Sequence, residues 1–287
     1  MQPYEGRISL NSLHPCKEVT MVNAIVAGAA GRMGKRIIHM IQQNPGITLA
    51  GAFEHPDHPA VHKDAGEEAG AGKLGVEIAP SLHAIAGRGD VLIDFTTPAA
   101  TLENLHAAVS KGLAMVIGTT GIRGEQLEEV RSLAEKIRCV MAPNMSVGVN
   151  VMFKIAREMA TLLGKDYDME ILEVHHRLKK DAPSGTAMHL ARILAETTGR
   201  DLEEVGVYER KGQVGERTDD EIGIQTWRGG DIAGEHTIMF AGIGERLELI
   251  HRAHNRDNFA RGAVRAALWL VEQSSGLYDM QDVLGLK

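Results

Sequence analysis

Short apolar, often β-branched runs alternate with amphipathic stretches from Val22 onward, which is typical of βαβ units around a parallel sheet. Residues 55–72, rich in His, Gly, Ala and Asp, predict a surface loop with at most one short helical turn. The expected strands are Val22–Ala27, Ile47–Glu54, Val91–Phe95, Ala114–Gly118 and Cys139–Ala142, and the expected helices are Arg32–Gln43, Ala99–Lys111 and Gly124–Ile137. The first half therefore predicts an α/β domain.

The pattern changes after residue 147. Helices are expected at Gly148–Leu163 and Gly185–Thr198, and strands at Met169–Val174, Val205–Arg210, Ile222–Trp227 and in a hairpin from Glu235–Phe240 to Arg246–Ala253. Strands joined by short turns indicate an antiparallel or mixed sheet, hence an α+β domain. A last amphipathic helix, Asn258–Gln273, is expected to pack on the first domain. We expect a flexible extension at 1–20, one domain from 21–148 with 258–287, and a second from 149–257.

Composition narrows the function classes. The 287 residues exceed the usual size of one domain, and no apolar run approaches the ~20 residues that span a bilayer. A net charge of −7 gives no long-range attraction to nucleic acid or anionic lipid, so an anionic substrate needs local cationic groups. Two dispersed cysteines, Cys16 and Cys139, form no disulfide framework and fit a reducing cytosol. Residues 1–20 lack the apolar core of a secretory signal.

A glycine-rich loop, Gly28-Ala29-Ala30-Gly31-Arg32-Met33-Gly34, follows the first expected strand and opens the first expected helix. Such a loop brings backbone N–H groups and the positive end of the helix to a pyrophosphate. Its GxxGxxG spacing is one residue longer than the usual GxGxxG, and similar loops also serve as structural turns. Glu54 lies twenty residues after Gly34, where an acid binds the adenosine ribose or is a solvated charge. Together these features predict dinucleotide binding.

Two further turns follow expected parallel strands, at the edge where such sheets bind ligands. They are Gly118-Thr119-Thr120-Gly121 and Ala142-Pro143-Asn144-Met145-Ser146, and Phe95-Thr96-Thr97-Pro98 ends another strand similarly. Their hydroxyl and amide groups can bind a nicotinamide carboxamide and its ribose. The same residue types are also ordinary turn formers.

Reactive side chains are densest between Glu173 and Thr186, in the run EVHHRLKKDAPSGT. Two histidines can exchange protons near neutral pH, and lysines can neutralise a carboxylate or donate a proton. The Ser-Gly-Thr at the following helix start offers hydroxyl and N–H groups to an anion. Alternatively, the lysines form a solvated turn and Ser184 and Thr186 only cap the helix.

Strand geometry sends His175 and His176 to opposite faces, so it directs at most one of them into a cleft. The doubled histidine lacks the i, i+4 spacing of helical zinc sites and has no cysteine nearby. We therefore expect no metal.

The run HHxxKxDAPSGTA at 175–187, with GAAGRMG at 28–34 and NMSVGVN at 144–150, resembles the bacterial 4-hydroxy-tetrahydrodipicolinate reductases. The resemblance extends over about residues 21–280 in the same order. It implies a Rossmann-type parallel-sheet domain completed by the C-terminal helix, and a substrate domain whose sheet builds a homotetramer. It further implies NADH or NADPH as cofactor and a small dicarboxylate substrate that loses water as its ring is reduced, in lysine and diaminopimelate biosynthesis.

The resemblance also implies residue roles. Proton donation falls to His175 and Lys179, and substrate contacts fall to His176, Gly185 and Thr186. The implied cofactor contacts are Gly28, Ala29, Ala30, Gly31, Arg32, Met33, Glu54, Gly118, Thr119, Thr120, Ala142, Pro143, Asn144 and Met145. His55 stands where some members carry Arg, and Pro143 and Met145 where others have Ala and Phe, which leaves the cofactor preference open.

Two alternatives remain. A related amino-acid dehydrogenase explains the glycine loop and Glu54 but not the whole run at 173–186. A non-catalytic dinucleotide sensor does not need proton donors beside an anion site, and it shows no turnover.

Overall fold

The computed structural model describes residues 21–287, so the extension expected at 1–20 lies outside the described residues. Seven strands form the first sheet, in the order β12-β6-β5-β4-β1-β2-β3, and all neighbouring pairs are parallel. They are β1 (Val22–Ala27), β2 (Ile47–Phe53), β3 (Ile78–Ala79), β4 (Val91–Asp94), β5 (Ala114–Ile117), β6 (Arg138–Met141) and β12 (Gly276–Tyr278). The order reverses between β1 and β4, so their carboxyl ends open a crevice.

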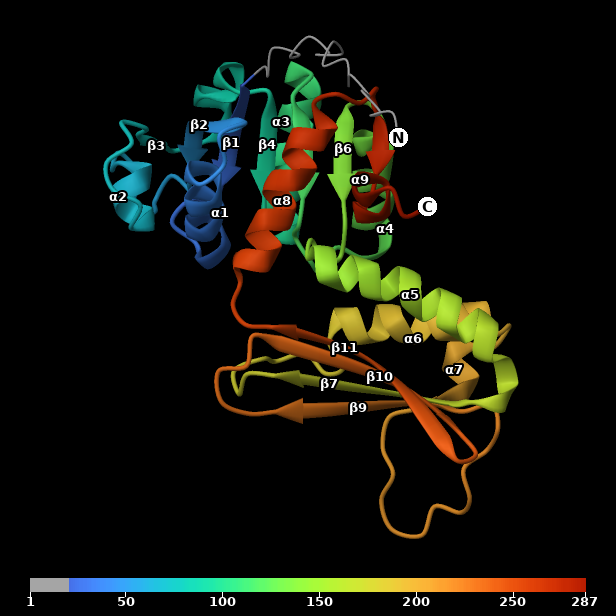
Figure 1. Cartoon of the computed structure of the whole chain (residues 1–287). Helices are drawn as coiled ribbons and strands as arrows, with labels where there is room; N and C mark the ends of the chain where they lie inside the picture. The colour runs from blue at the N-terminus through green and yellow to red at the C-terminus, as the bar shows by residue number, and fades with distance from the viewer. Residues whose placement is uncertain (1–20) are drawn as a thin grey trace, which may run out of the picture.

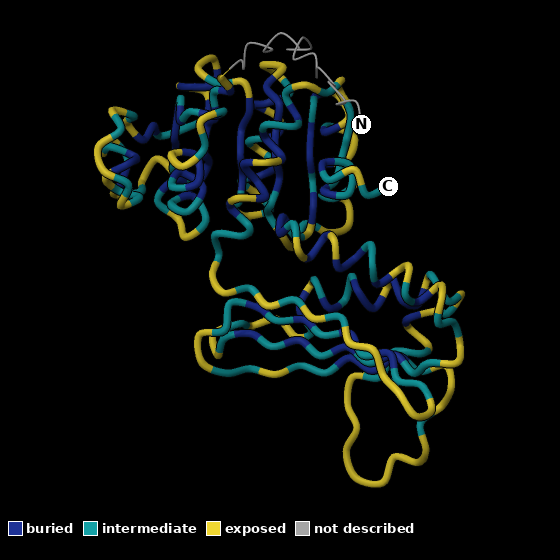
Figure 2. Tube along the Cα trace, in the orientation of Figure 1, coloured by how far each residue is buried: buried dark blue, intermediate teal, exposed yellow. Residues whose placement is uncertain are grey.

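Helices cover both faces of this sheet (Figure 1). Alternate residues of β1 serve opposite layers: Val26 packs with residues of the first and eighth helices, and Ile25 with residues of the third and fourth. Burial on both faces explains the continuous apolar runs of these strands, which are dark blue in Figure 2. The helices are α1 (Arg32–Gln42), α2 (Ala65–Ala69), α3 (Pro98–Lys111), α4 (Gly124–Ala134), α8 (Asp257–Leu270) and α9 (Met280–Leu284), with 3₁₀ turns at Leu82–Ala84 and Ala86–Arg88.

A second, mixed sheet lies below the first in Figure 1. Its order is β11-β10-β7-β9-β8, with β10 antiparallel to β7 and β11, and β9 parallel to β7 and β8. Its strands are β7 (Asp168–His175), β8 (Gly206–Val207), β9 (Ile222–Arg228), β10 (Gly234–Gly242) and β11 (Glu245–Ala253). The helices α5 (Val147–Leu163), α6 (Gly185–Thr197) and α7 (Leu202–Val205) lie on one side of it, and Gly164–Asp166 forms a 3₁₀ turn.

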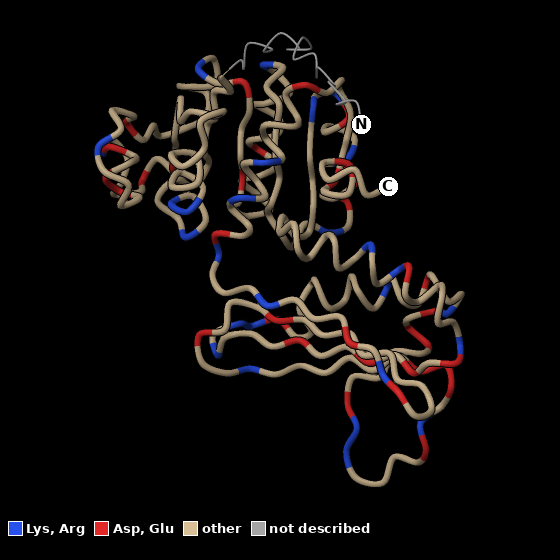
Figure 3. The backbone as a smooth tube through the Cα atoms, in the orientation of Figure 1, with Lys and Arg blue, Asp and Glu red and all other residues tan. Residues whose placement is uncertain are grey.

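The opposite face of this sheet carries no helix within residues 21–287. Trp227 on β9 and Ile250 on β11 are 62% and 42% exposed, respectively. The covered face is an apolar core in which Phe240 and Ile171 pack against α5 and α6. Acidic and basic residues are mixed along the chain in both parts of the molecule (Figure 3).

Most expected elements are confirmed, including the parallel sheet, the mixed sheet and the hairpin. The strand expected at Val205–Arg210 is present but shorter, because α7, capped by Asp201, extends through Val205 and only Gly206–Val207 then pair as β8. Arg210 instead turns away to bind Glu170 in a bidentate ion pair at 2.9 and 2.7 Å. The last helix ends at Leu270, and β12 and α9 follow it unpredicted.

Between residues 21 and 287, no helix combines the length and the apolar character needed to cross a membrane.

Candidate active site

The glycine loop connects β1 to α1 as expected. Gly28 has a φ of +62°, a conformation that favours glycine, and a Cβ at Gly34 would collide with the carbonyl oxygen of Gly28. Both glycines are thus required for the tight turn and for the close packing of α1 on it. Glu54 follows β2, and its Oε1 accepts a hydrogen bond from the N–H of Ala30 at 3.0 Å. The structure therefore brings the expected acid to the expected loop.

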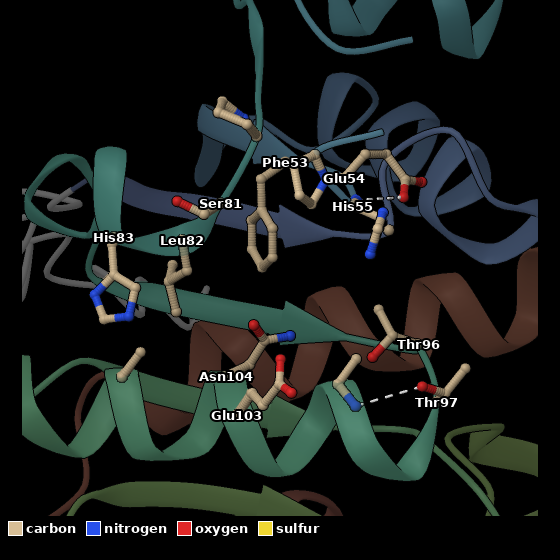
Figure 4. Close-up of a pocket in the computed structure, with 15 residues that line it drawn as sticks. Phe53, Glu54, His55, Ser81, Leu82, His83, Thr96, Thr97, Glu103 and Asn104 are labelled. Carbon is tan, nitrogen blue, oxygen red and sulfur yellow. Dashed lines mark hydrogen bonds between the residues drawn. The ribbon is translucent and has the colours of Figure 1, made fainter. Parts of the chain in front are cut away.

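A cavity of about 380 Å³ opens beside this loop, at the carboxyl ends of β1, β2 and β4 (Figure 4). Glu54 and His55 approach from one side, and Thr96, Thr97 and Asn104 from the other. Its charged or titratable lining residues are Glu54, Glu103, His55 and His83, with no lysine or arginine. Of the expected cofactor residues only Gly28 and Glu54 line it, so its place and size suit the adenosine end of a dinucleotide.

Asp94, which the sequence did not single out, organises the neighbouring turns from the end of β4. Its carboxylate accepts from the N–H of Thr96 at 2.9 Å, from the Thr119 hydroxyl at 3.3 Å and from Asn104 Nδ2 at 2.8 Å. Thr119 also accepts from the Thr101 hydroxyl at 2.8 Å. The buried carboxylate thus holds the turn after β4 against the turn after β5, where Gly118–Thr120 were expected to meet the cofactor.

The turn after β6 faces the second sheet's helices. Asn144 Nδ2 donates to the Thr186 hydroxyl on α6 at 3.0 Å, and Asn144 Oδ1 accepts from the Ser146 N–H at 2.9 Å. Met145 and Ala142 are buried in the core of the first sheet, whereas Pro143 is exposed. Asn144 therefore joins the expected cofactor and substrate segments.

The start of α6 has the features of an anion site. Ser184 caps the helix by accepting from the N–H of Ala187 at 3.2 Å, so the capping role expected for it is confirmed. Helix geometry leaves the first N–H groups without intrahelical acceptors, and those of Gly185 and Thr186 lie in this turn. The helix dipole adds partial positive charge there.

His175 ends β7 on the face that the helices cover, and it hydrogen-bonds through Nδ1 to the fully buried Glu173. Burial raises the pKa of Glu173, but hydrogen bonds from His175 and Arg228 outweigh burial and lower that pKa to about 2. Glu173 is therefore a permanent anion beside His175 near neutral pH. His176 follows the end of β7, so the alternation of faces expected for two adjacent strand residues does not decide where its side chain lies.

His236 on β10 is a second buried histidine, and its Nε2 lies 3.1 Å from the Ser184 hydroxyl. Its ring meets that of His175 edge to face, with centroids 5.3 Å apart. Burial, with the positive charge of His175 second, lowers the pKa of His236 to about 3. His236 is thus neutral, and it connects the cap of α6 to the catalytic candidate.

Positive groups gather near His176. Burial lowers the pKa of His176, and the charges of Arg256, His175, Lys179 and Arg32 lower it further, in that order. Arg32 opens α1 and Arg256 precedes α8, so cations from both parts of the molecule approach this point. Lys179 Nζ donates to both carboxylate oxygens of Asp181 at 2.9 Å.

Sequence reasoning missed Glu173 as a site residue, and it missed Arg228, His236 and Asp94. Glu173 lies inside the reactive run, two residues before His175, which is the spacing of one strand face. Arg228 and His236 lie 55 and 63 positions from Glu173, and no local pattern marks them.

The six-strand β3-β2-β1-β4-β5-β6 order, the glycine loop and Glu54 define a dinucleotide-binding Rossmann-type domain. The cluster of His175, His176 and Lys179 and the capped first turn of α6 stand next to it. This combination defines the class as a nicotinamide-dependent oxidoreductase.

The chain belongs to the dihydrodipicolinate reductase family, whose N-terminal model matches residues 22–145 and whose C-terminal model matches residues 148–284. The 4-hydroxy-tetrahydrodipicolinate reductases of Syntrophobacter fumaroxidans and Syntrophus aciditrophicus are 58% and 56% identical over 267 residues, which cover 93% of this chain and 100% of each relative. A dipicolinate-bound dihydrodipicolinate reductase from Paenisporosarcina sp. TG-14 is 28% identical, with a TM-score of 0.71 over 91% of this chain and 98% of the other.

These findings confirm the fold class and the family resemblance. Family membership favours the reductase over the amino-acid dehydrogenase alternative.

Proposed function

We propose that this chain reduces 4-hydroxy-tetrahydrodipicolinate to tetrahydrodipicolinate, with loss of water, in lysine and diaminopimelate biosynthesis. The observation that carries the proposal is the 3.0 Å hydrogen bond between Asn144 and Thr186. It places the anion site of α6 against the turn after β6, at the edge of the sheet where dinucleotides bind. The names of the relatives, and the dipicolinate bound to one of them, support a cyclic dicarboxylate as the substrate.

The dinucleotide fits the groups present on the first sheet. The N–H groups at the start of α1 suit a pyrophosphate, and Glu54 suits the ribose hydroxyls. A bound reduced nicotinamide supplies the hydride. We assign its remaining contacts to the expected segments 118–120 and 142–145, which Asp94 and Asn144 hold in place.

We propose that NADH is accepted at least as well as NADPH. A 2′-phosphate near Glu54 meets a carboxylate, and Glu103 adds a second one to a cavity without lysine or arginine in its lining. Two unit charges ~4 Å apart repel by ~1 to 4 kcal/mol, depending on the effective dielectric. His55 is a poorer partner for a phosphate than arginine, whose guanidinium binds phosphate bidentately.

Substrate carboxylates are bound by the first turn of α6 and by nearby cations. The N–H groups of Gly185 and Thr186 donate to one carboxylate, together with the Thr186 hydroxyl. His176, which lies near the positive charges of Arg256 and Arg32, adds a further polar contact. Because the carboxylates are charged before and after reduction, these contacts bind both states almost equally.

His175 and Lys179 act on the reacting ring. Hydride carries negative charge into the ring, and a cationic side chain nearby stabilises that charge as it develops. One of the two groups then protonates the ring carbon next to the reduced position. Both roles are exercised in the transition state, so they lower the barrier and do not merely tighten binding.

A coupled assay tests the activity. The preceding synthase generates the unstable substrate in situ, and nicotinamide absorbance reports turnover with NADH and then with NADPH. Oxidation that depends on the synthase is expected. A chain that binds NADH without turnover is a sensor, which contradicts the proposal.

We further propose a homotetramer built from the second sheet. Its uncovered face carries Trp227, Ile250 and half-buried Leu172 and Met239, and apolar sheet faces are normally covered by other chains or elements. In this arrangement residues 21–148 with 258–287 form the cofactor domain, and 149–257 form the substrate and assembly domain. Strand β12 pairs with β6, which supports the return of the C-terminus to the first domain.

A further inference from the structure

The carboxylate of Glu173 is fully buried, and four neighbouring residues hydrogen-bond to it. Arg228 donates from Nη1 and Nη2 to its two oxygens at 2.9 and 2.8 Å. The Thr226 hydroxyl and the Ser184 N–H donate to Oε1 at 3.2 and 3.0 Å. His175 Nδ1 completes the set at Oε2. Five contacts therefore join one side chain to β9, to the cap of α6 and to the catalytic candidate.

We propose that Glu173 is the positioning residue of the active site: it holds His175 with Nδ1–H directed at its carboxylate and leaves Nε2 as the ring nitrogen that exchanges a proton with the substrate. This inference rests on the proposed function, because it assumes that His175 is the proton donor. A carboxylate accepts but does not donate, so it selects the Nδ1–H tautomer. It also stabilises the imidazolium that forms when Nε2 takes a proton from solvent.

Arg228 keeps the carboxylate ionised. An isolated buried carboxylate is costly, and a bidentate guanidinium offsets that cost. The pKa of Glu173 is about 2, so the group retains its charge over the range in which the enzyme works. The pair of Glu173 and Arg228 is neutral as a whole.

Neighbouring groups restrict the other side of the His175 ring. Gly234 on β10 approaches Nε2, and a Cβ there would lie 3.0 Å from that nitrogen. His236 packs edge to face and is neutral because burial lowers its pKa to about 3. The charged and titratable groups of this cluster are Glu173 on the same strand as His175, Arg228 on β9, His236 on β10 with His251 beyond it, and His176, Lys179 and Asp181 in the following turn. Glu173 is the acid that hydrogen-bonds His175, whereas Asp181 binds Lys179.

The same pair positions the rest of the site. Arg228 Nη2 donates to the carbonyl of Asp181 at 2.7 Å, while Glu173 holds the N–H of Ser184. Both ends of the segment 181–184 are thus tied to one ion pair. Because Lys179 binds Asp181 and Ser184 caps α6, a single buried carboxylate aligns both proton donors with the anion site.

The test uses Glu173→Gln, which preserves shape and removes charge. Its matched control is Glu170→Gln: Glu170 lies on the same strand, faces the other side and is held bidentately by Arg210. For Glu173→Gln we expect kcat to fall about 10²-fold, with substrate KM changed only a few-fold. We also expect the basic limb of the kcat/KM–pH profile to move to lower pH by about one unit or more, since the imidazolium loses its anionic partner. Glu170→Gln should leave the profile in place.

If Glu173 has only a structural role, Glu173→Gln should lower the stability of the protein. The kcat and the kcat/KM–pH profile of the folded fraction should then match the wild type. That result overturns the inference. Full activity in His175→Ala also overturns the inference, because it removes the role of His175 as proton donor. Failure of the proposed function has a different sign, since the wild type then shows no oxidation of NADH or NADPH that depends on the synthase.

If Glu173→Gln does not fold, ¹⁵N NMR of the histidine rings in the wild-type protein shows which ring nitrogen of His175 carries the proton. The signal lost in His175→Gln identifies the ring, and its neutral form should carry the proton on Nδ1. A proton on Nε2 overturns the inference.

Discussion

The Nδ2 group of Asn144 donates to the Thr186 hydroxyl across 42 positions of sequence, at 3.0 Å. Asn144 lies in the turn after β6, which is one of the expected cofactor segments. Thr186 lies in the first turn of α6, where substrate contacts are expected. The contact therefore joins the expected cofactor segment directly to the expected substrate segment.

Asn144→Ala should weaken this link. Loss of one neutral hydrogen bond costs about 0.5–1.5 kcal/mol, so the affinity for dipicolinate at saturating NADH should drop about 2- to 10-fold. Titration calorimetry with and without NADH measures the change. Thr186→Ser keeps the acceptor hydroxyl and should retain the wild-type affinity; an equal loss in both variants would show that the contact is not the cause.

Lys179→Ala and Thr186→Val should change the steady-state kinetics in different ways. In the proposed mechanism the lysine acts in the transition state, so kcat and kcat/KM should fall together by about 10²–10⁴-fold. The proposed role of Thr186 is to bind a carboxylate that stays charged, so KM should rise about 10- to 100-fold with kcat little changed. Steady-state kinetics separate the two patterns, with NADH affinity as the control for folding. A wild-type kcat in Lys179→Ala would contradict the proposed role of Lys179 as a proton donor.

Glu54→Gln should shift the cofactor preference. Removing the carboxylate beside the glycine loop relieves repulsion of a 2′-phosphate, and the ratio of kcat/KM for NADPH over NADH should rise about tenfold. The wild type itself should use NADH at least as well. A strong wild-type preference for NADPH would show that a cation outside the cavity lining, such as Lys63, compensates.

His236 should make the fold sensitive to acid. Its folded pKa of about 3 lies below the usual 6.5, so the unfolded chain binds the extra proton between these values. Stability should consequently fall as pH decreases from about 6.5 toward 3, by up to ~1.4 kcal/mol per pH unit from this group. Glu173 adds a loss of the same sign, because its pKa is lowered from 4.5 to about 2 and stability falls as pH drops through that range.

Urea unfolding of His236→Gln at several pH values checks this. The slope of stability against pH should flatten between pH 6.5 and 4.5, and it should match the wild type above pH 7, where the imidazole is neutral in both states. An unchanged slope below pH 6.5 contradicts the assignment of a neutral, buried ring.

Trp227→Glu should dissociate the assembly. A charge placed on the uncovered face opposes burial against another chain, and light scattering should show a mass below that of a tetramer. Leu162→Glu is the matched control, because Leu162 is 84% exposed on α5, on the helix side of the sheet. A monomeric wild type at working concentrations contradicts the tetramer.

Local sequence determined those features that depend on neighbours along the chain. Some residue types favour a particular backbone conformation by themselves. Examples are the apolar run at Val22–Ala27, the glycines at 28 and 34 and the serine cap at 184. These local features were enough to predict the strands, the tight turn between β1 and α1 and the capped start of α6. The reactive run at 173–186 was equally visible, because its members are consecutive.

Tertiary structure decided what depends on distant partners. The three residues of β12 are too few to show periodicity, and they become a strand only by pairing with β6. The strand expected at Val205–Arg210 is limited to Gly206–Val207, and Arg210 beyond it pairs with Glu170 and Glu221, contacts that no local propensity encodes. Likewise Glu173 gains its hydrogen bonds from Arg228 only when the sheet brings β9 beside β7. The residue types were readable from the chain, whereas their pairing required the fold, because hydrogen bonds and charges act over a few ångströms of space irrespective of sequence separation.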